Sequence, residues 1–271
     1  METIYMKQQS KIIVSNRKIT YYIEYINKVG YRALRIALMV IRLILLVPYY
    51  FGGIWWHGVR KNYNFEEAYK FVQKVARSAC KAGRVTLVAE GVENLPKENG
   101  FIMFPNHQGL FDTLIFLSTC DNPFTLVIKK EASNIILLKQ VIAALRAHPI
   151  DRDDLRQSMQ VIKAMTQDVK EGRNVLIFAE GTRSRQGNKI GTFKGGSFKS
   201  ATMAKCPIVP CALVDSFKPF DENSIKPVTV KVKYMEPLYY EDYKDMKTSE
   251  IAEVVQNRIQ EEINRMTEQT F

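Results

Sequence analysis

The sequence is poor in the residues that usually build metal centres and disulfide frameworks. Its 271 residues include four cysteines and three histidines, and the cysteines form no CxxC pair and have no histidine close by. This spacing argues against a zinc site and against a set of disulfides. We therefore expect no metal and a reducing compartment, in which the thiols behave as small buried hydrophobes.

The sequence motifs of several common enzyme classes are also absent. The chain has no GxSxG nucleophile turn, no GxxxxGK[ST] phosphate loop, no GxGxxG and no HExxH. Their absence argues against an α/β-hydrolase, a P-loop nucleotidase, a dinucleotide-binding enzyme and a zinc protease of the HExxH type. Internal repeats and low-complexity linkers are missing too. The length then suggests one large globular domain, or one domain with an appendage.

Positive charge is concentrated at the N-terminal end of the chain. The net charge is +11, of which residues 1–61 contribute +8 through ten Lys or Arg and two Glu, and the remaining residues contribute +3. A nearly neutral body attracts nucleic acid only weakly, because such binding depends on neutralising phosphates. We therefore expect no nucleic-acid partner.

A long apolar stretch, Ile36 to Trp56, lies within the basic N-terminal region. Its 21 residues are interrupted only by Arg42 and Pro48, and about 20 apolar residues can cross a bilayer. An arginine near the centre of a span costs roughly 2.5 to 3.5 kcal/mol, and basic residues flank both ends of the stretch. We expect a helical hairpin that turns at residues 48–53 and inserts into one leaflet, with its arginines on anionic lipid. A single transmembrane anchor and a buried core helix are the alternatives.

The chain is expected to have two parts, divided after residue 62. Residues 1–62 form a basic, apolar, helical segment that associates with the bilayer, and residues 63–271 form an α/β domain. The expected location is the cell membrane at its cytoplasmic face, through a monotopic or single-span anchor.

Strand and helix patterns alternate through the body of the chain. Strands are expected at 84–90, 100–104, 124–130, 174–179, 207–214 and 227–235, and helices at 65–83, 111–119, 131–146, 153–171, 192–204 and 247–266. This alternation predicts an α/β fold with a mixed, largely parallel central sheet flanked by helices. In such folds the functional side chains emerge at the ends of strands.

The stretch "FPNHQGLFD" places His107 directly after an apolar run and Asp112 five positions later. On one continuous α-helix these side chains would lie about 140° apart and would not meet. If the histidine instead lies in a turn and the helix opens at Leu110, the carboxylate in the first helical turn can reach back to the imidazole. The spacing then predicts a His–Asp pair, for which a surface or structural role is the alternative.

Cationic side chains lie at or after the ends of two other expected strands and of one further short apolar piece, which precedes Arg152. The stretch "EGTRSR", residues 180–185, comes after the buried strand at 174–179; there a glycine allows close backbone approach and a guanidinium can hold a phosphate through two parallel hydrogen bonds. Polar turns and ion pairs on a helix N-terminus are the alternatives. The candidate cations are Lys129, Lys130, Arg152, Arg183 and Arg185. They form one site with the histidine pair if the strand ends share one edge of the sheet.

The motifs resemble those of the glycerolipid acyltransferase family. "NHQGLFD" matches NHxxxxD, "FAEGTRSR" is close to FPEGTRS, and "PIDR", "GTFKGGSFKSA" and "PIVPCAL" resemble further family blocks in the right order. The resemblance covers roughly residues 85–235. Two departures are Ala179, where a proline is usual, and residues 108–111, where the family varies and the choice of acceptor or donor is expected to lie.

The resemblance implies a glycerol-3-phosphate acyltransferase-like fold and a direct acyl transfer. His107 would be the general base that takes the proton from the 2-hydroxyl of lysophosphatidic acid, and Asp112 would orient it. The product would be phosphatidic acid. Acyl-CoA or acyl-acyl carrier protein would be the co-substrate, without cofactor or metal. The phosphate and glycerol would be bound by Lys129, Arg152, Glu180, Gly181, Thr182 and Arg183.

Other functions remain open at this point. The same chemistry could acylate glycerol 3-phosphate or another lysophospholipid, because the sequence gives no measure of pocket depth. A different class is a peripheral protein that binds anionic lipid without chemistry, whose activity would not depend on His107. The bilayer itself is an expected partner in each case.

Overall fold

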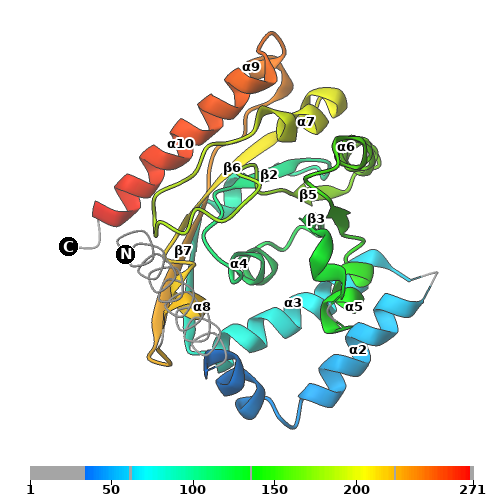
Figure 1. Cartoon of the computed structure of the whole chain (residues 1–271), viewed down its shortest axis with the longest axis vertical. Helices are drawn as coiled ribbons and strands as arrows, with labels where there is room; N and C mark the ends of the chain where they lie inside the picture. The colour runs from blue at the N-terminus through cyan, green and yellow to red at the C-terminus, as the bar shows by residue number, and fades with distance from the viewer. Residues whose placement is uncertain (1–33, 61–62, 135, 223, 269–271) are drawn as a thin grey trace, which may run out of the picture.

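Seven strands form one sheet that carries helices on both faces (Figure 1). The computed structural model describes residues 34–60, 63–134, 136–222 and 224–268. The strands are β1 (Val85–Glu90), β2 (Ile102–Pro105), β3 (Phe124–Lys129), β4 (His148–Ile150), β5 (Asn174–Leu176), β6 (Ile208–Val214) and β7 (Val228–Tyr234).

The order and direction of the strands determine which strand ends lie at the same edge of the sheet. The sheet runs β1-β7-β6-β2-β5-β3-β4. Strands β6, β2, β5, β3 and β4 are mutually parallel, while β7 is antiparallel to β6 and parallel to β1. The C-terminal ends of five adjacent strands therefore meet at one edge. This arrangement confirms the predicted mixed, largely parallel sheet.

The helices cover the sheet in two layers. They are α2 (Val47–Val59), α3 (Phe65–Ala82), α4 (Asp112–Thr119), α5 (Ile136–Ala144), α6 (Leu155–Lys170), α7 (Lys199–Ala204), α8 (Lys218–Asp221), α9 (Tyr240–Tyr243) and α10 (Thr248–Glu268), with short 3-10 turns η1 (Val92–Asn94), η2 (Lys130–Asn134) and η3 (Gly195–Phe198). Figure 1 shows α6, α7 and α10 on one face of the sheet, and α3 and α4 on the other.

The two apolar cores account for the burial pattern of the strands. All seven residues of β6 are buried, because helices cover both faces of the sheet at its centre. Strand β7 instead alternates buried and partly exposed positions. These patterns match the continuous and alternating apolar runs in the sequence.

Three expected elements differ in extent. The helix expected at 131–146 is divided into η2 and α5, and the one at 192–204 begins later, as η3 followed by α7. The strand expected at 174–179 ends at Leu176, although the backbone N–H of Ile177 still donates to Met103 on β2. The next residues leave the sheet and lead into the "EGTRSR" turn.

The N-terminal apolar stretch is bent, but earlier than expected. Helix 34–42 is followed by a turn at 43–46 and then by α2, and the two helices differ in direction by 97°. The expected turn at residues 48–53 is wrong, because Pro48 lies at the start of α2, where a missing N–H costs nothing. Gly53 lies within α2, where the ring of Phe71 fills the space that a Cβ would occupy.

Two arginines in or beside this stretch donate to backbone carbonyls of the α/β body. Arg35 is 2% exposed and donates to the carbonyls of Gly83, Ser224 and Lys226. Arg42 donates to the carbonyl of Ala82. Arg35 is therefore not available to anionic lipid, whereas Arg42 is exposed and its contact with lipid stays a prediction.

The described part of the chain contains one bent pair of apolar helices that bears on membrane spanning. No single helix there is long and apolar enough to cross a bilayer, whereas helix 34–42 and α2 together pass that test by length and composition. Residues 1–33 and 61–62 of the segment predicted as membrane-associating lie outside the described residues. The boundary after residue 62 stays a prediction.

Candidate active site

The histidine of the site lies in a tight loop at the end of β2. Asn106 fixes the start of this loop, because its side chain accepts from the backbone N–H of Leu213 at 2.7 Å and donates to the Leu213 carbonyl at 3.1 Å. The amide thus continues the ladder between β2 and β6 by one position. His107 follows at the edge of the sheet, with its side chain 17% exposed.

Asp112 pairs with His107 as the sequence spacing predicts. The Asp112 carboxylate is fully buried, and its Oδ2 lies 2.8 Å from His107 Nδ1. It also accepts from the backbone N–H groups of Gln108, at 2.7 Å, and Gly109, at 3.1 Å. With Nδ1 held by the carboxylate, Nε2 is the imidazole nitrogen left to accept a proton.

The helix that carries Asp112 starts later than expected. Helix α4 begins at Asp112 itself rather than at Leu110. The N–H groups of the preceding turn bond to the Asp112 side chain, so residues 108–111 form a loop around this carboxylate. Three donors in fixed directions hold the Asp112 side chain in one orientation.

Phe178 is a part of the site that the sequence alone does not single out. Its ring stacks on the imidazole of His107, with centroids 4.1 Å apart and planes inclined by 24°. Phe178 comes two residues before Glu180, so its place in the "FAEGTRSR" block was the available signal. The stack and the Asp112 hydrogen bond together fix the plane and the tilt of the ring.

Glu180 supports the site through backbone contacts. Its Oε1 accepts from the His107 N–H at 2.7 Å, and its Oε2 accepts from the Gly191 N–H at 2.9 Å. The side chain is 3% exposed, and burial raises the pKa of its carboxyl, while the hydrogen bonds from His107 and Gly191 act to lower it. These contacts occupy both oxygens, and a direct contact between Glu180 and glycerol or phosphate stays a prediction.

The "EGTRSR" turn lies against the histidine loop. The backbone N–H of Ser184 donates to the His107 carbonyl at 2.9 Å. Gly181 has a φ of +70°, a conformation that L side chains rarely adopt, and its N–H donates to the Phe178 carbonyl. The structure thus brings the His–Asp pair together with the turn that carries Thr182 and Arg183.

Lys129 and Arg152 lie on the same edge of the sheet, but further along it. Lys129 ends β3 and Arg152 follows β4, which are two and three strands from β2 in the sheet order. Strand spacing places these strands about 10 Å and 14 Å from β2. Lys129 is ion-paired with Glu131 at 2.9 Å, and both side chains are well exposed.

Gln108 connects three loops beneath the site. It is 2% exposed, and its Nε2 donates to Asn188 Oδ1 and to the Leu213 carbonyl, while its Oε1 accepts from the N–H and hydroxyl of Ser216. All of its polar atoms are thus engaged within the protein. Its side chain supports the loops rather than facing a ligand, so any role in choosing acceptor or donor would be indirect.

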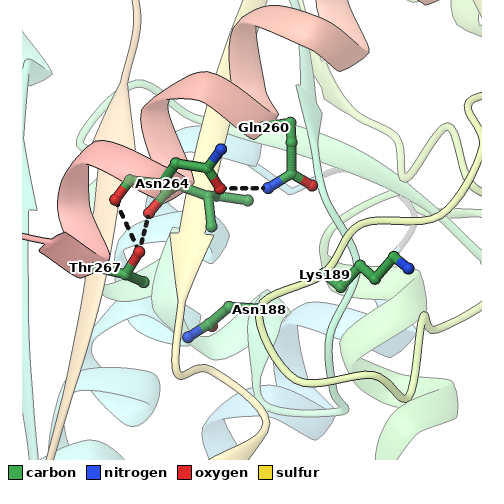
Figure 2. Close-up of a pocket in the computed structure, with 6 residues that line it drawn as sticks. Asn188, Lys189, Gln260, Asn264 and Thr267 are labelled. Carbon is green, nitrogen blue, oxygen red and sulfur yellow. Dashed lines mark hydrogen bonds between the residues drawn. The ribbon is translucent and has the colours of Figure 1, made fainter.

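A separate open pocket lies between the loop after the "EGTRSR" turn and α10 (Figure 2). It has a volume of about 510 Å³ and is lined by Asn188, Lys189, Gln260, Ile263, Asn264 and Thr267. Figure 2 shows Gln260, Asn264 and Thr267 on the helix and Asn188 and Lys189 on the facing loop. The predicted catalytic and phosphate-binding residues do not line it.

The cysteines are buried away from this chemistry. All four are free and buried, and burial raises the pKa of Cys120 and Cys206 to about 12. Such thiols stay protonated and unreactive at neutral pH. Within the ranges that the structure describes, no group of three or more His, Cys, Asp or Glu could hold a metal ion.

Known proteins are similar to this chain in sequence. A family model described as Acyltransferase matches residues 86–214. A 1-acyl-sn-glycerol-3-phosphate acyltransferase of Borreliella burgdorferi is 30% identical over 52% of this chain and 56% of its own length. A protein of the same name from Helicobacter pylori is 27% identical over 81% of this chain and 90% of its own length.

A solved structure shares the fold along most of the chain. The crystal structure of PlsC, the 1-acyl-sn-glycerophosphate (LPA) acyltransferase from Thermotoga maritima, superposes with a TM-score of 0.68 at 22% identity. The match covers 87% of this chain and 98% of that one. The resemblance inferred from the motifs is confirmed over residues 86–214, where the chain matches the Acyltransferase family model, and the solved structure shows that the fold is shared as well.

Proposed function

We propose that the protein transfers a fatty acyl group from an acyl thioester to the 2-hydroxyl of lysophosphatidic acid, and so produces phosphatidic acid. The observation that carries this proposal is the junction of the His107–Asp112 pair with the "EGTRSR" turn. Glu180 and Ser184, both in that turn, are each hydrogen-bonded to the His107 backbone. These bonds support the proposal, because they hold the predicted proton acceptor beside the turn predicted to bind the phosphate.

The pair supplies the proton transfers of a direct acyl transfer. His107 Nε2 takes the proton of the acceptor hydroxyl as its oxygen attacks the thioester carbonyl, and buried Asp112 stabilises the imidazolium that forms. The C–S bond then breaks, and the imidazolium returns the proton to the departing thiolate. Because the acceptor oxygen is itself the nucleophile, no acyl-enzyme intermediate is required.

The phosphate of the acceptor needs cations between it and the buried carboxylates. Asp112 and Glu180 both lie at the site and both would repel a phosphate near-dianion. Arg183, three residues after Glu180 in the same turn, supplies a guanidinium that can bind phosphate through two parallel hydrogen bonds. Lys129 and Arg152 would add positive charge from the strands further along the edge.

The names of similar proteins support the same acceptor. The relatives from Borreliella burgdorferi and Helicobacter pylori are named 1-acyl-sn-glycerol-3-phosphate acyltransferases, and a Mycoplasma pneumoniae protein, 28% identical over 67% of this chain, is named a probable one. The match spans little more than half of the Borreliella protein's length. Both acyl-CoA and acyl-acyl carrier protein remain candidate donors.

The bent N-terminal helices support the proposed membrane location, while the cytoplasmic face stays a prediction. Their surface exposes large apolar side chains, among them Ile41 at 69%, Leu45 at 91% and Trp56 at 57%. An apolar surface of this kind, which includes a tryptophan, suits insertion into one leaflet. An enzyme seated there avoids extracting its lipid acceptor into water, at about 0.8 kcal/mol per methylene.

Product analysis tests the proposal directly. Detergent-purified protein is incubated with lysophosphatidic acid, glycerol 3-phosphate or lysophosphatidylcholine, each with acyl-CoA or acyl-acyl carrier protein. We expect phosphatidic acid from lysophosphatidic acid as the main product, identified by mass. Acylation of glycerol 3-phosphate or lysophosphatidylcholine in preference to lysophosphatidic acid would replace the proposed acceptor, and no acylated product from any combination would favour a lipid-binding role without chemistry.

A further inference from the structure

Lys194 lies directly over the "EGTRSR" turn. A Cβ added to Gly181 would meet the Lys194 side chain at three atoms, with Nζ at 3.1 Å, Cε at 3.3 Å and Cδ at 3.5 Å. The ammonium group therefore rests against the residue that links Glu180 to Thr182. Gly181 is required here for two reasons, its positive φ and the close passage of this lysine.

The backbone that carries Lys194 is fixed on the side of the turn. The Lys194 N–H donates to the Ala179 carbonyl at 2.9 Å, and the Gly191 N–H donates to Glu180 Oε2 at 2.9 Å. Residues 191–194 therefore run along residues 179–181 as a strap with two bonds. The position of Lys194 is thus tied to the same carboxylate that holds the His107 backbone.

The same strap is anchored on its other side to α10. The Phe193 N–H donates to Gln256 Oε1 at 2.8 Å. Gly195 packs so closely on the start of α10 that an added Cβ would lie 3.0 Å from the Ser249 nitrogen. Bonds on both sides hold the base of the lysine side chain, and only its outer part is free to adjust.

The Lys194 ammonium is exposed and has no ion pair or hydrogen bond with any residue that the structure describes. In this it differs from Lys129, which pairs with Glu131, and from Lys130, which pairs with Asp151. It lies against the turn itself, whereas Arg152 follows β4, two strands away from β5, which leads into the turn. A lysine whose base is held and whose charge has no protein partner is suited to an anionic ligand.

We propose that Lys194 binds the phosphate of the acceptor, as a second cation beside the turn that carries Arg183. This inference rests on the proposed function, because it names a further contact to the same phosphate. Lys194 would add a point charge to the bidentate contact that an arginine provides. The phosphate site would then be built by the turn and the strap together, more than by the distant ends of β3 and β4.

The test compares Lys194→Ala, Lys194→Arg and a matched control, Lys199→Ala. Lys199 is an exposed lysine five residues further on, at the start of α7. Steady-state kinetics give KM for lysophosphatidic acid and kcat, and calorimetry gives the Kd for glycerol 3-phosphate without turnover. We expect Lys194→Ala to raise both KM and Kd about 5- to 20-fold, with kcat within about twofold of wild type. Lys194→Arg should restore most of the affinity, and Lys199→Ala should change neither constant.

The outcomes separate this inference from the proposed function. Equal Kd and KM for wild type and Lys194→Ala would overturn the role of Lys194 while leaving the acyl transfer intact. An equal loss of affinity in Lys199→Ala would also overturn it, because the effect would then be one of general surface charge. Wild-type protein that binds glycerol 3-phosphate through Lys194 but forms no phosphatidic acid would contradict the proposed function alone.

Discussion

At the scale of single residues, Asp112 has the most constrained side chain of the site. Its carboxylate is fully buried and accepts from two backbone N–H groups besides contacting the His107 imidazole. Asp112 therefore fixes both the loop at residues 108–111 and the imidazole ring of His107. A substitution that keeps the shape of Asp112 but removes its charge allows the effect on catalysis to be measured apart from the effect on stability.

For Asp112→Asn we expect kcat to fall by about 10² to 10⁴, because a neutral amide does not stabilise the imidazolium and favours the wrong tautomer. The free energy of unfolding should drop by about 1 to 3 kcal/mol, because the amide NH₂ faces backbone donors in a buried place. Turnover of lysophosphatidic acid and urea unfolding measure the two effects. Full turnover in a folded variant would remove Asp112 from the mechanism.

Glu180→Gln distinguishes a positioning role from substrate contact. Glutamine keeps one acceptor oxygen where the carboxylate uses two, so either the His107 or the Gly191 N–H loses its partner. A misplaced His107 should lower kcat about 10- to 100-fold with little change in KM for lysophosphatidic acid. A large rise in KM with unchanged kcat would instead show that Glu180 contacts the acceptor. Arg183→Lys is the comparison variant, since it should mainly raise KM.

At the scale of elements, apolar patterns predicted most strands and helices correctly. The unbroken run of β6 and the alternation of β7 reflect burial on two faces and on one, which sequence periodicity reports directly. The turn expected at residues 48–53 was wrong for a tertiary reason. Gly53 lies inside a helix and leaves space for the ring of Phe71 from α3. The local sequence does not distinguish such a glycine from one that forms a turn.

The two adjacent glycines of α2 give a matched stability test. A Cβ at Gly53 would lie 2.0 Å from the Phe71 ring, whereas a Cβ at Gly52 would have nothing within 4 Å. Gly53→Ala should therefore destabilise the protein by about 1 to 3 kcal/mol through overpacking. Gly52→Ala should stabilise α2 by about 0.5 to 1 kcal/mol, since alanine favours a helix. Chemical unfolding of both variants measures this, and equal effects would show that α2 does not pack on α3 as described.

At the scale of the whole molecule, the order of the strands decides which predicted residues meet. The motifs indicated that all the predicted site residues follow strands. The order of strands in the sequence does not show how far apart their ends lie along the edge of the sheet. The structure places β5 beside β2 and β4 at the far edge. The contacts of Phe178, Gln108 and Lys194 were not predicted for a related reason, because they join segments that are distant in sequence.

The exposed apolar surface of the N-terminal helices predicts the membrane contact. Replacing Ile41 and Leu45 together by serine should reduce binding to anionic lipid vesicles by about tenfold or more, because two large side chains would no longer enter the leaflet. Leu155→Ser is the control, since Leu155 on α6 is 85% exposed but lies outside that surface. Vesicle sedimentation measures binding. Equal binding by wild type, the double variant and Leu155→Ser would show that another surface of the protein contacts the membrane.

The proposed chemistry depends on the imidazole of His107, which we propose as the proton acceptor in acyl transfer to a phosphate-bearing lipid. The most direct measurement is the rate of phosphatidic acid formation by His107→Ala beside wild type, with unfolding curves for both. We predict a rate about 10² to 10⁴ lower in a variant that folds normally, because only the general base is lost. A folded His107→Ala protein that forms phosphatidic acid at the wild-type rate would contradict the account.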